Sequence, residues 1–146
     1  MIKVKNLTKN YGEQKAVDNI SFEVRTGEIL GFLGPNGAGK TTTMRIITCY
    51  MPPNSGTVEI DGKNIFDDSL SIRKKIGYLP ENAPLYMDMN TIDYLYFVMG
   101  LRGVSKKDYR KRLKDIIEIC GLGSEIHKDI GELSKGFRQR VGLARL

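Results

Sequence analysis

The chain has 146 residues, with 23 lysines and arginines against 17 aspartates and glutamates, so its net charge is +6 with the single histidine neutral. This length allows one domain with a hydrophobic core, and no stretch approaches the roughly 18 apolar residues of a membrane-spanning helix. These features favour a cytoplasmic protein that reaches a membrane only through a partner. Cys49 and Cys120 form no C-x-x-C pair and lie in apolar helical patterns, so we interpret both as buried reduced thiols.

Strand-like patterns fill the start of the chain. Residues 2–7 are expected to form a strand, and residues 16–24 alternate as a half-buried strand does. Residues 57–60 and 63–65 flank Asp61-Gly62, a dipeptide that favours a two-residue hairpin turn. The part of the chain up to about residue 84 is therefore expected to be rich in strands, apart from one helix.

A glycine-rich segment lies between these strands. Residues 34–41 read Gly-Pro-Asn-Gly-Ala-Gly-Lys-Thr and fit the phosphate-loop pattern G-x-x-x-x-G-K-[ST], in which successive backbone N–H groups point at phosphate oxygens. Lys40 can reach the outer phosphates, and the Thr41 hydroxyl can bind Mg²⁺. The apolar run 28–33 predicts a buried strand before the loop, and residues 41–51 predict the helix after it. A glycine-rich turn that matches by accident would not need this order of elements, so the pattern indicates a nucleotide site. We expect nucleotide contacts from Gly34, Pro35, Asn36, Gly37, Ala38, Gly39, Lys40, Thr41 and Thr42.

The pattern becomes helical after about residue 84. Thr91 is placed to cap a helix that runs to residue 100. Ser105 with Asp108 resembles a capping box at the start of a second helix, which Gly121 should end.

Most of the excess positive charge lies in this second helical region. From Arg102 to Asp115 there are seven basic and two acidic residues, a net charge of +5 that leaves +1 for the rest of the chain. An apolar stripe lies behind the bases, formed by Tyr109, Leu113, Ile116, Ile117 and Cys120. We interpret the bases as a solvated helix face, with attraction to acidic lipid headgroups as the alternative. Nucleic acid is not expected as a partner, because no aromatic residues are interleaved along a basic surface.

The last residues carry a second motif. Residues 133–145, Leu-Ser-Lys-Gly-Phe-Arg-Gln-Arg-Val-Gly-Leu-Ala-Arg, predict a helix capped by Ser134. The same segment resembles the signature segment of ATP-binding cassette (ABC) ATPases, whose usual core is Leu-Ser-Gly-Gly-Gln. Tyr11 stands where this family places an aromatic residue that stacks on adenine, and residues 76–81 look like the strand that enters the family's Q-loop. The resemblance covers the chain from Tyr11 onward and most suggests the bacterial subgroup that pairs one cassette with a separate permease, including gliding-motility and sodium- or drug-export types.

The resemblance implies an α/β fold of the phosphate-loop NTPase (ABC ATPase) class. A β-rich subdomain would cover about residues 1–84, and a helical subdomain with the signature would cover about residues 85–146. The implied ligands are ATP and Mg²⁺. Lys40 would be catalytic, Tyr11 would contact adenine, and Thr41 would bind Mg²⁺ together with Glu81, which would also assist catalysis.

The signature would act across a dimer. By the resemblance, Ser134 and Gly136 meet the γ-phosphate of an ATP molecule held by a second cassette. Two motifs depart from the family pattern: Glu81 replaces the usual Gln, and the signature has Lys135 and Phe137 where Gly and Gln are usual.

The function implied is the ATP-binding subunit of an ABC transporter, held at the inner face of the cell membrane by a permease subunit. Residues 81–89, with Met99 close behind, have two interpretations: helix-packing residues with a polar loop, or a groove that receives a helix of the permease.

In the family, the Walker B strand and a switch histidine follow the signature helix, whereas this sequence ends at Leu146 and its single histidine, His127, precedes the signature. We expect the N-terminal part of a cassette, ending before Walker B and unable to hydrolyse ATP alone. The alternatives are a nucleotide-binding module that never hydrolyses, and an ABC ATPase outside transport.

Overall fold

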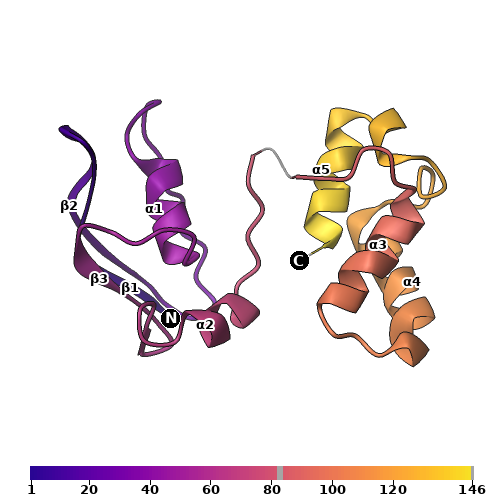
Figure 1. Ribbon diagram of the computed structural model, residues 1–146, viewed down its shortest axis with the longest axis horizontal. Coiled ribbons are helices and arrows are strands. Elements are labelled where there is room, and N and C mark those ends of the chain that lie inside the picture. The colour runs from indigo at the N-terminus through magenta and orange to yellow at the C-terminus, as the bar shows by residue number, and fades with distance from the viewer. Residues whose placement is uncertain (82–83, 146) are drawn as a thin grey trace. The chain divides into compact units, whose positions relative to one another are not determined.

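The computed structural model describes residues 1–81 and 84–145 (Figure 1). The chain divides into two compact units, a first unit of Met1–Gly77 and a second unit of Tyr78–Leu146. Among the described residues, no helix is long and apolar enough to cross a membrane.

The first unit is built on an antiparallel sheet of four strands in the order β2-β1-β3-β4. The strands are β1 (Ile2–Tyr11), β2 (Gln14–Val24), β3 (Ser55–Ile60) and β4 (Lys63–Asn64). Strand β1 lies between β2 and β3, and its Val4 is opposite Phe22 on one side and Val58 on the other. The strands expected from alternation are confirmed. So is the hairpin, because Asp61 and Gly62 both take the positive φ, +51° and +76°, that a two-residue hairpin turn requires.

Two short helices complete the first unit, α1 (Lys40–Ile47) and α2 (Ser69–Lys75). They bury one hydrophobic core with the sheet, to which α1 contributes Ile46 and Ile47 and α2 contributes Ile72. The sheet side of this core is formed by Val4, Leu7, Val17, Val58 and Ile60. Burial of these side chains supplies most of the driving force that holds α1, and the loop before it, against the sheet.

The expected strand 28–33 is wrong. The segment has no strand assignment, and Ile29 is 98% and Leu33 93% exposed. A strand needs a neighbour for its N–H and C=O groups, and the four strands of the described sheet pair only with one another. The apolar composition that suggested a buried strand is real, but the described residues provide no partner strand for it.

Two further boundaries differ from the expectation. The helix expected over residues 41–51 ends at Ile47, because Cys49 takes a left-handed φ of +58° that interrupts an α-helix. Residues 76–81, expected as a strand, have no strand assignment either, and the boundary between the two units lies within them, after Gly77.

The second unit is helical. It contains α3 (Thr91–Leu101), the 3-10 turn η1 (Lys106–Asp108), α4 (Tyr109–Cys120), the 3-10 turn η2 (Ile130–Glu132) and α5 (Lys135–Ala144). Helix α4 contacts both α3 and α5 (Figure 1). The buried centre comprises Tyr94, Leu95, Met99, Leu113, Leu122, Ile126, Ile130, Leu133 and Val141. The apolar stripe predicted for the basic helix packs against this core through Leu113 and its neighbours.

The helix ends test the predicted caps. Asn90, one residue earlier than expected, caps α3 by accepting a hydrogen bond from the Ile92 amide, while the Thr91 hydroxyl donates to the Lys128 carbonyl at 2.8 Å. The Ser105 capping box is wrong, because the Ser105 side chain accepts no cap hydrogen bond and a 3-10 turn intervenes before α4. Gly121 does end α4, with a left-handed φ of +61°.

Candidate nucleotide-binding site

The phosphate loop runs directly into α1 and depends on glycine at one position in particular. Gly37 and Gly39 have φ of +84° and +81°, a region that side chains other than glycine rarely adopt. A Cβ atom on Gly39 would collide with the carbonyl oxygen of Ala16 in β2. The loop therefore lies so close to the β1–β2 hairpin that only glycine fits at position 39. This close contact fixes the start of α1.

Lys40 is held inside this loop. Its Nζ atom donates to the carbonyl oxygens of Gly34 and Pro35, each at 2.6 Å. Phosphate oxygens carry charge and accept hydrogen bonds from an ammonium more strongly than neutral carbonyls do. A bound phosphate would therefore compete well for the Lys40 ammonium without requiring a new position for the backbone.

The start of α1 offers further donors. The first intrahelical bond runs from the Thr43 amide to the Gly39 carbonyl at 2.8 Å, and the first N–H groups of any helix have no partner within the helix. Thr41 is exposed, whereas Thr43 is buried and its hydroxyl has no partner among the described residues. The Thr41 hydroxyl is thus free to serve as a ligand.

The donor set suits Mg²⁺ held mainly by phosphate and water. Among the described residues, no three His, Cys, Asp or Glu side chains cluster to hold a metal ion. Mg²⁺ typically takes one or two protein oxygens and completes its shell with substrate phosphates and water. An exposed Thr41 hydroxyl next to a phosphate loop fits that pattern.

Tyr11 ends β1 at the hairpin that also holds Gly39 in place. Its side chain is 45% exposed, its hydroxyl donates to the Met51 Sδ atom at 3.3 Å, and the Lys9 ammonium lies 5.8 Å from the ring centroid. A ring that is anchored at its hydroxyl and open to solvent can stack on a base.

The second unit carries the signature. Ser134 caps α5, as expected, by accepting from the Phe137 amide at 3.3 Å, and both Ser134 and Gly136 are exposed. Phe137 is half-buried, and the Arg140 guanidinium lies 5.0 Å from its ring centroid. Arg140 also donates to the Gly121 carbonyl and so joins α5 to the end of α4. The unusual Phe137 therefore belongs to the packing of the helix.

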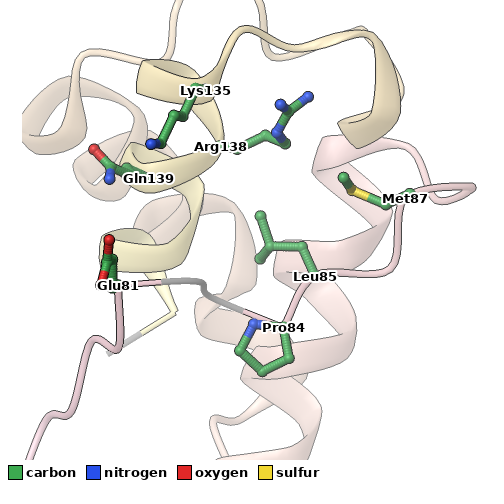
Figure 2. A pocket seen from close by; sticks show the side chains of 7 residues that line it. All are labelled: Glu81, Pro84, Leu85, Met87, Lys135, Arg138 and Gln139. Carbon is green, nitrogen blue, oxygen red and sulfur yellow. The ribbon is translucent and has the colours of Figure 1, made fainter. Parts of the chain in front are cut away.

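Both polar departures from the family pattern line one pocket of the second unit. Figure 2 shows Glu81 and Lys135 at a pocket of about 420 Å³, together with Gln139 on the next turn of α5 and the apolar side chains of Leu85 and Met87. Sequence reasoning treated the two departures separately. Their opposite charges face the same space, a relation that only the fold can reveal.

These features define a nucleotide-binding module of the phosphate-loop type. Residues 17–146 match the family described as ABC transporter. The chain belongs to the ABC transporter ATP-binding family, and the resemblance drawn from its signature segment is confirmed.

Several relatives illustrate the match. The chain is 40% identical over 145 residues to the bacitracin transport ATP-binding protein BcrA of Bacillus licheniformis, covering 99% of this chain and 46% of that protein. It is 34% identical over 148 residues to the choline transport ATP-binding protein OpuBA of Bacillus subtilis, covering 99% of this chain and 39% of that protein. The chain spans about half the length, or less, of the curated relatives that it matches.

Solved structures agree. The dimeric structure of a bacterial ABC transporter cassette matches with a TM-score of 0.86 and 32% identity, over 99% of this chain and 68% of that one. A dimeric cassette in a post-hydrolysis state, bound to ADP and Pi, matches with a TM-score of 0.85 and 30% identity, over 99% and 68% of the two chains. The α/β cassette fold is therefore confirmed.

Some of the residues discussed from the sequence remain to be placed in the structure. His127 has a structural contact, since its carbonyl oxygen accepts a hydrogen bond from the Asn90 side chain. Residues 82 and 83 of the expected permease groove, and the last residue, Leu146, lie outside the described residues. The roles of Asn90 and Arg140 were missed by sequence reasoning, although an asparagine directly before Thr91 is a recognisable cap signal.

Proposed function

We propose that this chain is the ATP-binding part of an ABC transporter, in which ATP binding and hydrolysis drive a separate membrane permease. The observation that carries the proposal is the phosphate loop, with a position at Gly39 that only glycine can occupy and a lysine held inside the loop. Family membership supports the same function.

Each residue of the first unit has a distinct task in this proposal. The backbone N–H groups of the loop, from every residue of 34–39 except Pro35, and the Lys40 ammonium bind the phosphates. Thr41 and Thr42 lie in the first turn of α1 beside them, and Tyr11 stacks on adenine. Mg²⁺, when bound, neutralises phosphate charge, and the Thr41 hydroxyl is the ligand that this unit offers it.

The second unit acts on a nucleotide held by another copy. Ser134 and Gly136, both exposed at the start of α5, are proposed to contact the γ-phosphate of the partner cassette's ATP. Glu81 is proposed as an auxiliary catalytic group and Mg²⁺ ligand. A carboxylate repels phosphate oxygens where the usual Gln would not, so Glu81 makes this contact dependent on the metal ion.

The permease contact is proposed at the aromatic surface of the second unit. Tyr86 is 61% exposed, and its ring meets Phe97 at 5.8 Å in an edge-on arrangement. Met87 is exposed beside it, while Leu85 and Met89 pack against the core. Its inward packing and its exposed, adaptable apolar surface are what support the proposed contact. A cassette so docked lies at the inner face of the membrane.

The test is calorimetric titration with ATP and Mg²⁺. Lys40→Ala should abolish or strongly weaken binding, because the loop loses the charge that faces the outer phosphates. Lys74→Ala is the control: Lys74 is an exposed base in the last turn of α2. Equal affinities of the two variants would remove the assignment of the phosphate loop.

A second candidate is a module that binds nucleotide without hydrolysing it. The observation in its favour is Glu81, a carboxylate that repels phosphate oxygens where the family usually has Gln. Under both candidates the nucleotide site is the same, and only turnover separates them.

A further inference from the structure

Helix α4 presents a charged surface that nucleotide binding does not use. All seven bases between Arg102 and Lys114 are exposed. Arg110, Lys111 and Lys114 lie within about 100° of one another around the helix, and the buried Leu113 is about 60° from Arg110 and about 160° from Lys111. We call these three side chains, with Lys106 and Lys107 in the preceding turn, the basic face of α4.

The charges of this face are not used within the fold. Every ion pair that the structure records among its described residues lies elsewhere, mostly on the strands and turns of the first unit. No carboxylate of the described part of the chain lies within 4.0 Å of a base on the face, although Asp108 and Asp115 are near in sequence.

The order of charges along α4 also opposes the stability of the helix. The first turn of α4 contains no acidic residue and the last turn contains no basic one, whereas a helix dipole favours acids at the start and bases at the end. Among the pairs four residues apart, Arg110 and Lys114 repel each other, while Lys111 with Asp115 and Lys114 with Glu118 attract. The bases therefore gain nothing from the ends of the helix, and they stay exposed to an external anionic partner.

We propose that the basic face of α4 binds the anionic headgroups of a phospholipid membrane. Clusters of four to eight Lys and Arg residues are typical of binding to anionic lipids. The apolar stripe of α4 packs against the core of the second unit, so the attraction rests on the charges of the face.

Nucleic acid fits this face less well. Tyr109, the aromatic residue within the cluster, is turned inward and stacks on Tyr96 at 5.5 Å, so the face lacks exposed rings on which bases could stack. The lipid proposal rests on the proposed function only in that a cassette bound to a permease works close to a membrane surface. Vesicle binding needs no nucleotide, so it can fail or succeed independently of the Lys40 titration.

The experiment is co-sedimentation of the chain with vesicles. We expect binding to vesicles of equal parts phosphatidylglycerol and phosphatidylcholine at low salt and little binding to pure phosphatidylcholine. Raising the ionic strength toward 1 M should remove the binding, because screening then acts within about 3 Å. The triple variant Arg110→Gln, Lys111→Gln, Lys114→Gln should bind on the order of 100-fold more weakly than the parent chain.

The matched control removes the same three charges elsewhere. Lys5→Gln, Arg73→Gln, Lys74→Gln takes one arginine and two lysines from exposed positions of the first unit and should bind like the parent chain. Equal weakening in the two variants would overturn the proposal, since net charge alone would then explain the attraction. Undiminished vesicle binding by the first variant would overturn it as well, as would an absence of binding by the parent chain at low salt. If the triple variant of the basic face lost binding to a single-stranded oligonucleotide but still bound vesicles, the face would be assigned to nucleic acid instead.

Discussion

Tyr11 is a single side chain whose ring and hydroxyl can be tested separately. The hydroxyl bonds to Met51 and the ring stays open to solvent. Tyr11→Ala removes both groups and should weaken ATP binding by about 1–3 kcal/mol, the usual range for stacking on a base. Tyr11→Phe keeps the ring and should retain most of the affinity. Calorimetry decides the matter: a Phe variant as weak as the Ala variant would assign the contact to the hydroxyl.

At this scale the sequence predicts the phosphate loop well because its chemistry is local. Glycine, lysine and threonine stand within eight consecutive positions, and the backbone angles at Gly37 and Gly39 follow from residue type. The relation of Glu81 to Lys135 is different. These residues are far apart in the chain, so their shared pocket depends on how the second unit packs.

Among the elements, α4 carries a charge pattern that can be improved. Arg110→Glu puts an acid in the first turn and turns a repulsive pair with Lys114 into an attractive one. The helix dipole should contribute about 0.3–1 kcal/mol and the pair about 0.2–0.5 kcal/mol to stability. Urea unfolding followed by circular dichroism measures the gain, with Arg110→Gln as the intermediate case. A less stable Glu variant would show that Arg110 has a stabilising contact in the folded chain, and the argument for a binding face would weaken.

The N-cap of helix α2 makes the stability of the folded chain decrease at acid pH. Its cap, Asp68, accepts hydrogen bonds from the Ser71 hydroxyl, the Lys63 ammonium and the Ser71 amide, which lower its pKa from 3.8 to about 2. The unfolded chain therefore binds this proton more readily than the folded chain does. The stabilisation from Asp68 is complete above about pH 4 and is lost as the pH falls toward about 2.

The variant Asp68→Asn isolates that effect. Asn can still cap the helix, but it has no charge to lose. We expect the variant to be less stable than the parent at neutral pH and the difference to shrink as the pH falls from about 4 to about 2. Urea midpoints at several pH values measure the difference. A difference that stays constant across this range would mean that Asp68 is not the group responsible.

The type of an element is predictable where its own side chains determine it. It is less predictable where a neighbouring strand elsewhere in the chain determines it. The alternation in β1 and β2 and the turn at Asp61-Gly62 are confirmed because the pairing strands adjoin in sequence. Residues 28–33 have the composition of a buried strand, yet composition does not supply a neighbour. Helix ends were misplaced where local backbone geometry overrides the pattern, as at Cys49, and where a 3-10 turn intervenes, as before Tyr109.

At the scale of the whole chain, these 146 residues contain a phosphate loop and a signature segment, and they span about half the length, or less, of the curated relatives that the chain matches. In the proposed function, Lys40, Thr41 and the loop amides would supply positioning and charge neutralisation, which dominate phosphoryl transfer. A general base is still needed to orient the attacking water, and the sequence contains no Asp-Glu pair. The exposed Ile29 and Leu33 leave apolar chain open to solvent as well.

We therefore expect the purified 146-residue chain to bind ATP without steady turnover and to aggregate on heating. Residues 28–33 have apolar side chains and no strand partner, so their backbone N–H and C=O groups can pair with the same segment of another molecule. A longer chain that carries a further apolar strand ending in Asp-Glu should gain both a cooperative melt and Mg²⁺-dependent hydrolysis, because that strand would supply the missing neighbour and the missing carboxylate. Phosphate release measured at saturating ATP tests the prediction. Steady release by the 146-residue chain that Lys40→Ala abolishes would show that its own residues suffice for catalysis.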